Sequence, residues 1–237
     1  MDIKVKFDSS AFTQSPARLA KNIRFATAVA LTRTAGTIRL AEIAEMKSVF
    51  DRPTPWTLNS LAVKPATKTN LVALVRKKEF GANSAGHILG PHIDSGQRGM
   101  RRAEQALGGF VVPGRGMKLD RYGNLAPATY VKILSQLKLS SDSNANASNS
   151  SRSKAKRRNE AYFMLSDKKG LGKRVGKRIV FQRKGQNIMP ALLILKQPPK
   201  YGARFPYFRK GEKVFDTVFP FEFDRAIEQA FSDAGWK

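Results

Sequence analysis

The chain contains no cysteine and only two histidines among its 237 residues. Disulfides and thiolate metal sites are therefore excluded, and two imidazoles leave little scope for a metal centre. No segment approaches the roughly 20 consecutive apolar residues that a membrane-spanning helix needs. The first residues, MDIKVKFDSS, lack the apolar core of a secretory signal. We therefore expect a soluble protein that is made in a reducing compartment.

Acidic residues are scarce in this chain. There are 18 Asp and Glu against 43 Lys and Arg, which gives a net charge of +25. A positive excess of this size favours an anionic partner, because like charges repel one another unless opposite charge lies nearby. The partner is either nucleic acid or an acidic protein surface.

Positive charge is concentrated between residues 150 and 178, where only Glu160 and Asp167 oppose it. A run of like charge can also be a solvated loop that keeps a protein soluble. Both interpretations stay open for this segment taken alone. The candidate contacts to DNA or to an acidic partner are Arg152, Lys154, Lys156, Arg157, Arg158, Lys168, Lys169, Lys173, Arg174, Lys177 and Arg178.

The first third of the chain has clear periodic patterns. Alternation of apolar residues with lysines over Ile3–Phe7 predicts a short, half-buried strand. Ser15-Pro16 is typical of a helix start, and apolar residues at helical spacing extend the predicted helix to about Phe50. Residues 51–60 contain two prolines and are expected to form a loop. Residues 61–63 and 71–75 then predict the two strands of a hairpin.

The middle of the chain is less regular. Residues 81–99 are glycine-rich and are expected to be irregular. Residues 101–107 predict a short helix, and residues 128–139 predict another, with Tyr130, Ile133 and Leu137 on one face. Between them, residues 108–127 are expected to form an extended loop.

The last part begins with a polar, low-complexity segment at 140–153, which cannot bury enough apolar surface to order itself. We expect a flexible insertion there. Residues 161–165, 178–183 and 188–196 predict three strands, and residues 219–231 predict an amphipathic C-terminal helix.

Together these patterns predict one domain over residues 1–237 that contains helices, strands and long irregular loops. The loops include a long insertion at 81–127 and a flexible basic insertion at 140–158.

No pattern in the sequence indicates catalysis. Gly170, Gly172 and Gly176 fit no phosphate-binding loop, and His87 and His92 flank Gly90-Pro91, so they cannot share a helical face. No histidine base and nucleophile elbow accompany a serine, and no paired carboxylates are evident. We therefore expect no enzyme, no catalytic residues, no cofactor and no metal.

Aromatic residues lie among the basic ones at Tyr162-Phe163 and again at Tyr201, Phe205 and Tyr207-Phe208. Aromatic side chains beside cations form stacking platforms for single-stranded nucleic acid. Strands of any basic sheet protein have the same pattern, and packing in a core is the favoured interpretation of these residues.

Several segments resemble the lambda-type minor tail protein Z, or tail-completion, family of tailed phages. That family opens with an alanine-rich helix of the pattern A-x-A-L-x-R-x-A, which stands here at Ala28–Ala35. It ends with a basic aromatic strand and a helix, here Tyr201–Phe208 and Phe219–Phe231. The segments Arg52–Leu71 and Val112–Leu125 look like parts of uncharacterised proteins from phage and prophage structural gene clusters.

The resemblance implies an α+β subunit, in which a long N-terminal helix and a C-terminal helix pack on an antiparallel β-sheet. It implies a structural virion protein, a tail-completion or neck subunit, assembled in the host cytoplasm. It implies a homo-oligomeric ring, commonly a hexamer, that joins the tail tube to the head connector around the DNA path. The implied partners are other copies of the chain, a tail terminator or tail tube protein, a head connector or adaptor protein, and packaged DNA. A free nucleic-acid-binding protein that uses the 152–178 block is the alternative, and a nuclease is a third.

Overall fold

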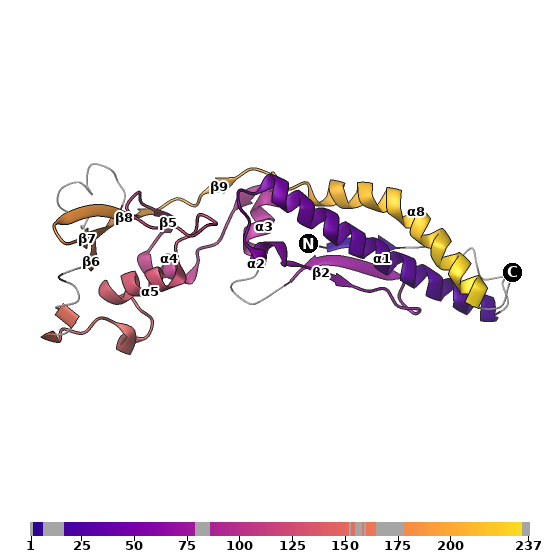
Figure 1. The fold of residues 1–237 in the computed structure, drawn as a ribbon, viewed down its shortest axis with the longest axis horizontal. Helices are drawn as coiled ribbons and strands as arrows, with labels where there is room; N and C mark the ends of the chain where they lie inside the picture. The colour runs from indigo at the N-terminus through magenta and orange to yellow at the C-terminus, as the bar shows by residue number, and fades with distance from the viewer. Residues whose placement is uncertain are drawn as a thin grey trace. The chain divides into compact units, whose positions relative to one another are not determined.

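The computed structural model describes residues 2–6, 17–78, 86–151, 153–154, 158, 160–164 and 178–233 (Figure 1). The fold is α+β, with long helices near both ends of the chain and antiparallel sheets, as the sequence predicts. The contacts divide the chain into two compact units, residues 1–96 with 201–237 and residues 97–200. The sequence patterns suggested one domain. The division arises because residues 97–200 have a hydrophobic core of their own.

The first unit joins a three-stranded sheet to two long helices. Its strands are β1 (Asp2–Lys6), β2 (Leu61–Lys64) and β3 (Val72–Lys77), and they form an antiparallel sheet of order β1-β3-β2. This confirms the predicted N-terminal strand and the hairpin. The helices are α1 (Ala17–Val49), α2 (Pro55–Leu58), α3 (Gly86–Ile93) and α8 (Tyr207–Asp233).

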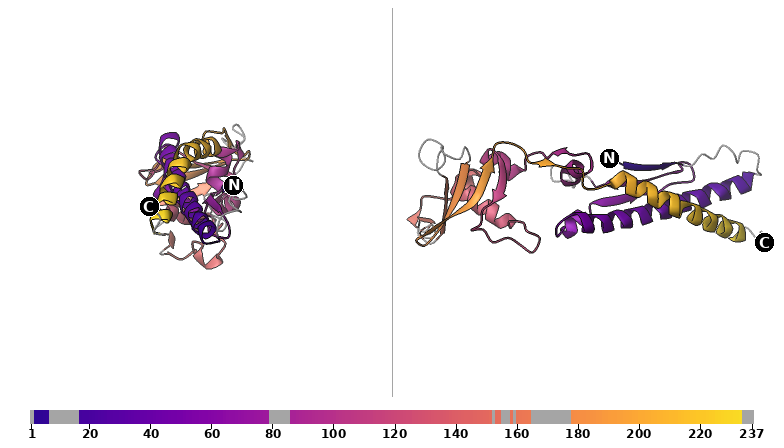
Figure 2. Two further views of the ribbon diagram at one scale, coloured as in Figure 1. Left: turned by 90° about the vertical axis from the view of Figure 1, so that its right-hand side faces the viewer. Right: turned by 90° about the horizontal axis from the view of Figure 1, so that it is seen from above.

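Helices α1 and α8 lie side by side in opposite directions, as Figures 1 and 2 show. Glu45 near the end of α1 pairs with Lys210 near the start of α8, at 2.9 Å. Ala26 and Ala30 near the start of α1 pack with Ala226 near the end of α8. Small side chains at this crossing let the two backbones approach closely. On its sheet side, α1 buries Leu31, Ala35 and Ile38 with Ala73 and Val75 of β3.

The second unit packs two helices on a four-stranded sheet. The helices are α4 (Arg102–Leu107) and α5 (Pro127–Gln136), and a 3₁₀ turn, η3, spans Ser143–Ala145. The strands are β5 (Phe110–Pro113), β6 (Glu160–Met164), β7 (Arg178–Lys184) and β8 (Asn187–Leu195), in the antiparallel order β5-β8-β7-β6. Two short strands, β4 (Gly96–Gln97) and β9 (Lys200–Tyr201), form a separate two-stranded sheet.

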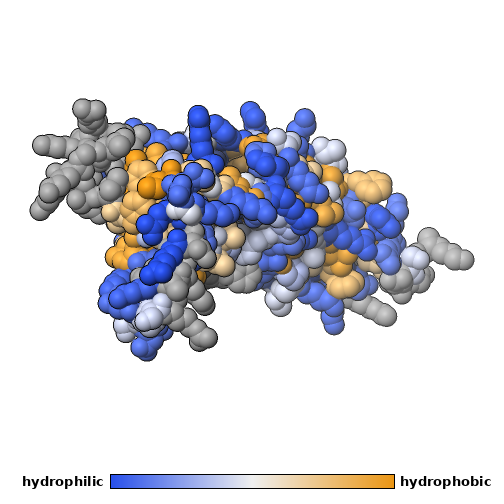
Figure 3. Space-filling model, turned by 60° about the vertical axis from the view of Figure 1, so that its left-hand side comes forward, coloured by the Kyte–Doolittle hydropathy of each residue, from blue (hydrophilic) through white to orange (hydrophobic). Residues whose placement is uncertain are grey.

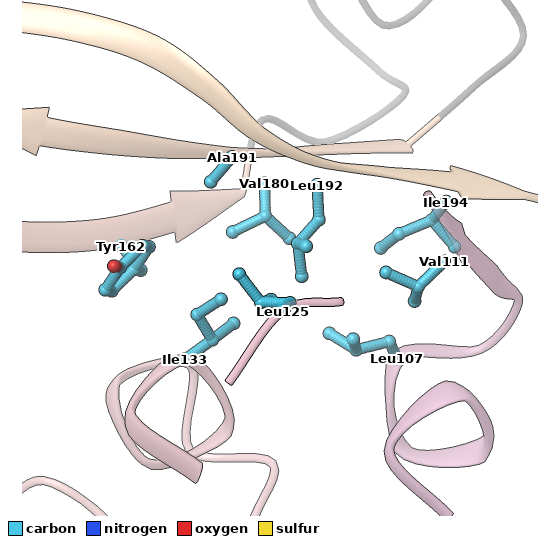
Figure 4. Packing of buried hydrophobic residues seen from close by; sticks show 9 residues of the cluster. All are labelled: Leu107, Val111, Leu125, Ile133, Tyr162, Val180, Ala191, Leu192 and Ile194. Carbon is cyan, nitrogen blue, oxygen red and sulfur yellow. The ribbon is translucent and has the colours of Figure 1, made fainter. Parts of the chain in front are cut away.

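The core of the second unit lies between the helices and one face of this sheet (Figure 4). Side chains from α4 and α5 point toward side chains from the strands, and all are nearly inaccessible to water. Burial of apolar area from separate elements is the main force that holds them together. The buried residues are Leu107, Val111, Leu125, Ile133, Tyr162, Val180, Ala191, Leu192 and Ile194.

Three segments expected to be irregular contain regular structure. The loop predicted at 51–60 holds α2, because the Thr54 side chain caps it and Pro55 suits the first helical position. The glycine-rich stretch holds α3, whose Leu89 is buried with Phe205. The extended loop at 108–127 contains β5, which pairs with β8. Within the expected insertion at 81–127, the structure thus contains the predicted helix α4 and two further regular elements, α3 and β5.

The C-terminal helix is longer than predicted, since it starts at Tyr207 rather than Phe219. Tyr201–Phe208 is therefore not a strand beyond its first residue. The helix continues through Pro220, whose exposed ring lies away from α1. Packing along α1 compensates for the one backbone hydrogen bond that proline removes.

The polar segment after α5 is more ordered than its composition indicates. The Ser135 hydroxyl donates to the Ala145 carbonyl at 2.5 Å, and the Ala147 amide donates to the Ser135 carbonyl at 3.0 Å. The Ser140 amide donates to the Asn146 side chain at 3.1 Å. These hydrogen bonds take the place of the apolar burial that the segment lacks, and the expected flexibility of 140–158 stays a prediction.

Candidate interfaces for charged partners

Three of the eleven predicted contact residues fall in the described part of the chain. Lys154 and Arg158 have exposed side chains, and Arg178 begins β7 opposite Ile194. The structure therefore leaves the proposed role of this block as a prediction. The remaining candidates lie outside the described residues: Arg152, Lys156, Arg157, Lys168, Lys169, Lys173, Arg174 and Lys177.

The sheet of the second unit has an aromatic pair on the face opposite its core. Phe163 of β6 lies directly across from Phe181 of β7, and their rings stack with centroids 5.8 Å apart. Both side chains are half-buried, and Arg183, two residues further along β7, is exposed. An aromatic pair beside a cation can stack nucleic-acid bases.

The core face of the same sheet carries a closed polar network. Glu160 accepts hydrogen bonds from Lys132, from the Tyr162 hydroxyl at 3.1 Å and from Gln182 at 2.7 Å. The bond from Lys132, followed by those from Gln182 and Tyr162, holds the pKa of Glu160 below its usual range. Burial, with Glu160 beside it, raises the pKa of Tyr162 to about 12. These side chains meet one another's hydrogen-bonding needs, and the bond from Gln182 to Glu160 links β7 to β6.

A second satisfied carboxylate lies at Glu104 of α4. Arg98 donates two hydrogen bonds to it, at 2.6 and 2.5 Å, and the backbone amides of Arg101 and Val111 donate at 2.8 and 3.1 Å. Burial opposes ionisation, but these donors together hold the pKa of Glu104 below its usual range. Glu104 is only 3% exposed, so it is a structural ion pair rather than a binding group.

The aromatic residues mostly pack in cores. Tyr162, Phe205 and Tyr207 are buried, which confirms core packing for them. Phe208 is exposed on α8, and Phe163 belongs to the stacked pair on the outer sheet face.

His92 lies between the rings of Phe50 and Tyr201, with centroids 5.0 and 4.8 Å away. Burial, with Arg204 nearby, lowers the pKa of His92. Across the ranges that the structure describes, no group of three or more His, Cys, Asp or Glu could hold a metal ion.

A basic surface of the first unit was not identified from the sequence. Lys4 of β1 and Lys64 of β2 both lie opposite Leu74 of β3, and Arg76 lies two residues further along β3. All three cationic side chains are exposed, and none has an ion-pair partner among the described residues. We call Lys4, Lys64, Arg76 and Leu74 the sheet patch. The alternation of Lys4 with apolar neighbours predicts an exposed lysine on a strand. The functional interpretation of the sequence, however, was based on the dense basic block at 150–178.

An acidic row on α8 was also missed. Glu212, Asp216, Asp224 and Glu228 recur at multiples of four residues and are all exposed. No hydrogen bond or ion pair joins these carboxylates to any described residue. At 3.6 residues per turn, Glu212 with Asp216 and Asp224 with Glu228 each share a face, whereas Glu212 and Glu228 lie about 160° apart around the helix. Their spacing was visible in the sequence, but the extent of α8 was not.

Hydrophilic residues cover most of the surface visible in Figure 3, with hydrophobic residues in smaller areas between them. No protein-family model, curated protein or solved structure matches the chain. Within the described ranges, none of the helices combines the length and the apolar character required for a bilayer crossing.

Proposed function

We propose that this chain is a structural protein of a tailed-phage particle. It is a tail-completion or neck subunit that acts by assembly, in a ring that joins the tail tube to the head connector around the DNA path. The observation that carries the proposal is the number of large apolar side chains that the first unit leaves exposed. They are Phe25, Leu40, Trp56, Phe208 and Phe221.

Exposed aromatic and aliphatic groups of this size favour association with other protein surfaces. Leu40 and Phe221 are 64% and 67% exposed, on α1 and α8 respectively. In a subunit of a ring, neighbouring copies and axial partners cover such groups. Glu104 and Glu160, by contrast, are engaged by hydrogen bonds inside the second unit and stabilise its fold.

The alanine-rich motif of the tail-completion family supports the same proposal. It lies inside α1, where Ala28, Ala30, Leu31 and Ala35 are buried. Small residues there allow the close approach of α8, so the pattern has a packing role in this chain. The resemblance at the C-terminus is weaker, because Tyr201–Phe208 leads directly into α8 instead of forming a strand.

The net charge of +25 suits a protein that surrounds a DNA path or binds acidic neighbours. The deciding experiment is the mass of the purified chain by light scattering, with and without duplex DNA at two salt concentrations. A ring, formed alone or with head and tail partner proteins, supports the proposal. A monomer that joins no partner and binds DNA tightly at low salt contradicts it.

The free nucleic-acid-binding protein is a second candidate, favoured by the stacked Phe163–Phe181 pair with Arg183 beside it. Replacement of Phe163 by Leu would then weaken single-strand binding by ~1–3 kcal/mol for the lost base stack. Unchanged binding of a fluorescent oligonucleotide by this variant would remove the candidate.

A further inference from the structure

The sheet patch has three cationic side chains around an apolar centre, and in the strand register Asp2 of β1 lies opposite Arg76. Neighbouring strands lie about 4.8 Å apart, so Lys4 and Lys64 are roughly 10 Å apart across Leu74, and Arg76 lies about 7 Å along β3. Leu74 is half-buried between these cations, and so is Val72, two residues away on the same face. The patch could therefore accept one apolar side chain flanked by carboxylates.

Helix α8 presents such a group. Thr217, Phe221, Asp224 and Glu228 follow one another at spacings of four, three and four residues, which places them on one face of the helix. Phe221 is the most exposed large hydrophobic side chain among the described residues, at 67%. Asp224 and Glu228 are exposed and make no ion pair with the rest of the described chain. We call Phe221, Asp224 and Glu228 the α8 patch.

We propose that the α8 patch of one copy docks on the sheet patch of a second copy. Phe221 packs on Leu74, between the aliphatic stems of the lysines, while Asp224 and Glu228 pair with Lys64, Arg76 and Lys4. This contact rests on the proposed assembly function and specifies which surfaces meet in it.

The spacing and charge of the two patches agree. Residues four apart on a helix lie ~6 Å apart, so Asp224 and Glu228 fit within the ~10 Å between Lys4 and Lys64. Asp224 and Glu228 make no ion pair with the described residues, although the chain has only 18 acidic residues. The cations of the sheet patch, which lie on the same unit, have the complementary charge. A DNA backbone would meet the cations of the sheet patch but would leave Phe221 uncovered.

The two patches are different surfaces of one chain, so the contact is heterologous. Each copy offers its α8 patch to one neighbour and its sheet patch to the other. Such contacts produce a ring where the rotation closes and a filament where it does not.

Absence of native cysteine allows a direct test by disulfide trapping. One preparation carries Lys64→Cys with an affinity tag, and another carries Asp224→Cys without a tag. The two are mixed under mild oxidation, so that a tagged–untagged product reports only contacts between copies. We expect this product to form at least ten times more than with the control Gln229→Cys, which is exposed on α8 about 140° away from Asp224.

Charge reversal gives the second arm of the test. Asp224→Lys with Glu228→Lys should lower the association constant at least tenfold, and Lys64→Glu with Arg76→Glu should do the same. A mixture of the two reversed chains should associate, because each carries the complement of the other. Yields equal to those of the Gln229→Cys control, or no recovery in the mixture, would overturn the proposed contact.

The mass of the same wild-type sample separates this inference from the proposed function. A ring without the 64–224 disulfide overturns the contact and leaves the function standing. A monomer that joins no partner, binds DNA and gives no disulfide overturns both. If Lys64→Glu with Arg76→Glu reduces only DNA affinity and leaves the mass unchanged, the sheet patch is a nucleic-acid surface and the inference is wrong.

Discussion

The hydroxyl of Tyr207 donates a 2.7 Å hydrogen bond to the backbone carbonyl of Val75, 132 residues earlier in the chain. Tyr207 is the first residue of α8, and Val75 lies in the central strand of the first unit's sheet. Both residues are buried. This one bond ties the start of the C-terminal helix to the N-terminal sheet.

Tyr207→Phe should lower the free energy of unfolding by about 1–2 kcal/mol, since it removes the donor and leaves a buried carbonyl less satisfied. Urea denaturation followed by circular dichroism measures the change. Tyr122→Phe, at a half-exposed ring in the second unit, is the matched control and should cost less than about 0.5 kcal/mol. Equal effects of the two substitutions would mean that the bond to Val75 contributes nothing.

Glu42 on α1 should make the protein less stable as pH rises. Its side chain is fully buried, and neither carboxylate oxygen has a hydrogen-bond partner among the described residues. Burial, with Glu45 adding to it and Lys210 opposing it, raises the pKa of Glu42 from 4.5 to about 8. The folded chain therefore holds a proton between these pH values that the unfolded chain releases.

The contribution of Glu42 to the free energy of unfolding is fully present below pH 4.5 and is lost as the pH rises toward 8. The slope is ~1.4 kcal/mol per pH unit within that window. Glu42→Gln should flatten the dependence and raise stability at pH 8, as measured by urea melts at several pH values. Glu228→Gln, on the exposed side of α8, should keep the wild-type slope. A wild-type slope in the Glu42→Gln variant would contradict this account.

Elements with strong periodicity could be predicted from the sequence. The structure agrees with the strand predicted near the N-terminus, with the long helix α1 and with three of the four strands in the second unit's sheet, β6, β7 and β8. Helix α3 and strand β5 could not be predicted, because tertiary partners create them. Leu89 of α3 is buried against Phe205 from far along the chain, and β5 exists through its pairing with β8.

The candidate contact residues were predicted from the density of positive charge in the sequence, and not from positions in space. The dense basic block attracted the functional interpretation, and most of it lies outside the described residues. The sheet patch required the register that sets Lys4 and Lys64 on either side of Leu74, and sequence alone does not give strand register. The α8 patch lies inside the helix predicted at 219–231, but the sequence does not show that α1 packs on the other face of this helix and leaves the patch exposed.

Glu104 should be the most sensitive ion-pair position in the second unit. It accepts hydrogen bonds from Arg98 and from the amides of Arg101 and Val111, so it joins α4 to the segment before it and to β5. Glu104→Ala should cost about 3–5 kcal/mol, because it removes one partner of a buried pair. Gln105→Ala, exposed on the same helix, is the control and should be nearly neutral.

The pH dependence of Glu104 has the opposite sign to that of Glu42. Its pKa is lowered in the folded state, so its contribution is present above pH 4.5 and is lost as pH falls through the folded value. Glu104→Ala should therefore lose stability at pH 7 and converge with wild type in strong acid. The melting temperatures of the variant and of wild type are compared across this pH range. A constant difference between them down to the lowest pH would refute the ionic interaction.

Gly114 directly follows β5 and packs closely against the backbone of β8. A methyl group at this position would sit 2.1 Å from the Pro190 carbonyl oxygen, and the Gly114 amide donates to the Ala191 carbonyl at 2.7 Å. Gly114→Ala should cost about 2 kcal/mol or more, since backbone rather than a flexible side chain must move. Gly99→Ala has open space around it and should change the melting temperature little. Equal melting temperatures for both variants would show that the two segments separate easily.

Phe221 should matter for association and not for folding. At 67% exposure its ring contributes little to the stability of a single copy, so Phe221→Ser should leave the melting temperature of the unassembled chain unchanged. If the aromatic side chain packs on Leu74 of a neighbouring copy, its loss should weaken association by about 2 kcal/mol, or roughly 30-fold in the dissociation constant.

Sedimentation velocity over a range of protein concentrations measures this change in the dissociation constant. Val131→Ser, with a similarly exposed apolar side chain on α5 of the second unit, is the matched control and should assemble like wild type. Identical dissociation constants for Phe221→Ser and Val131→Ser would show that the α8 patch has no special part in assembly.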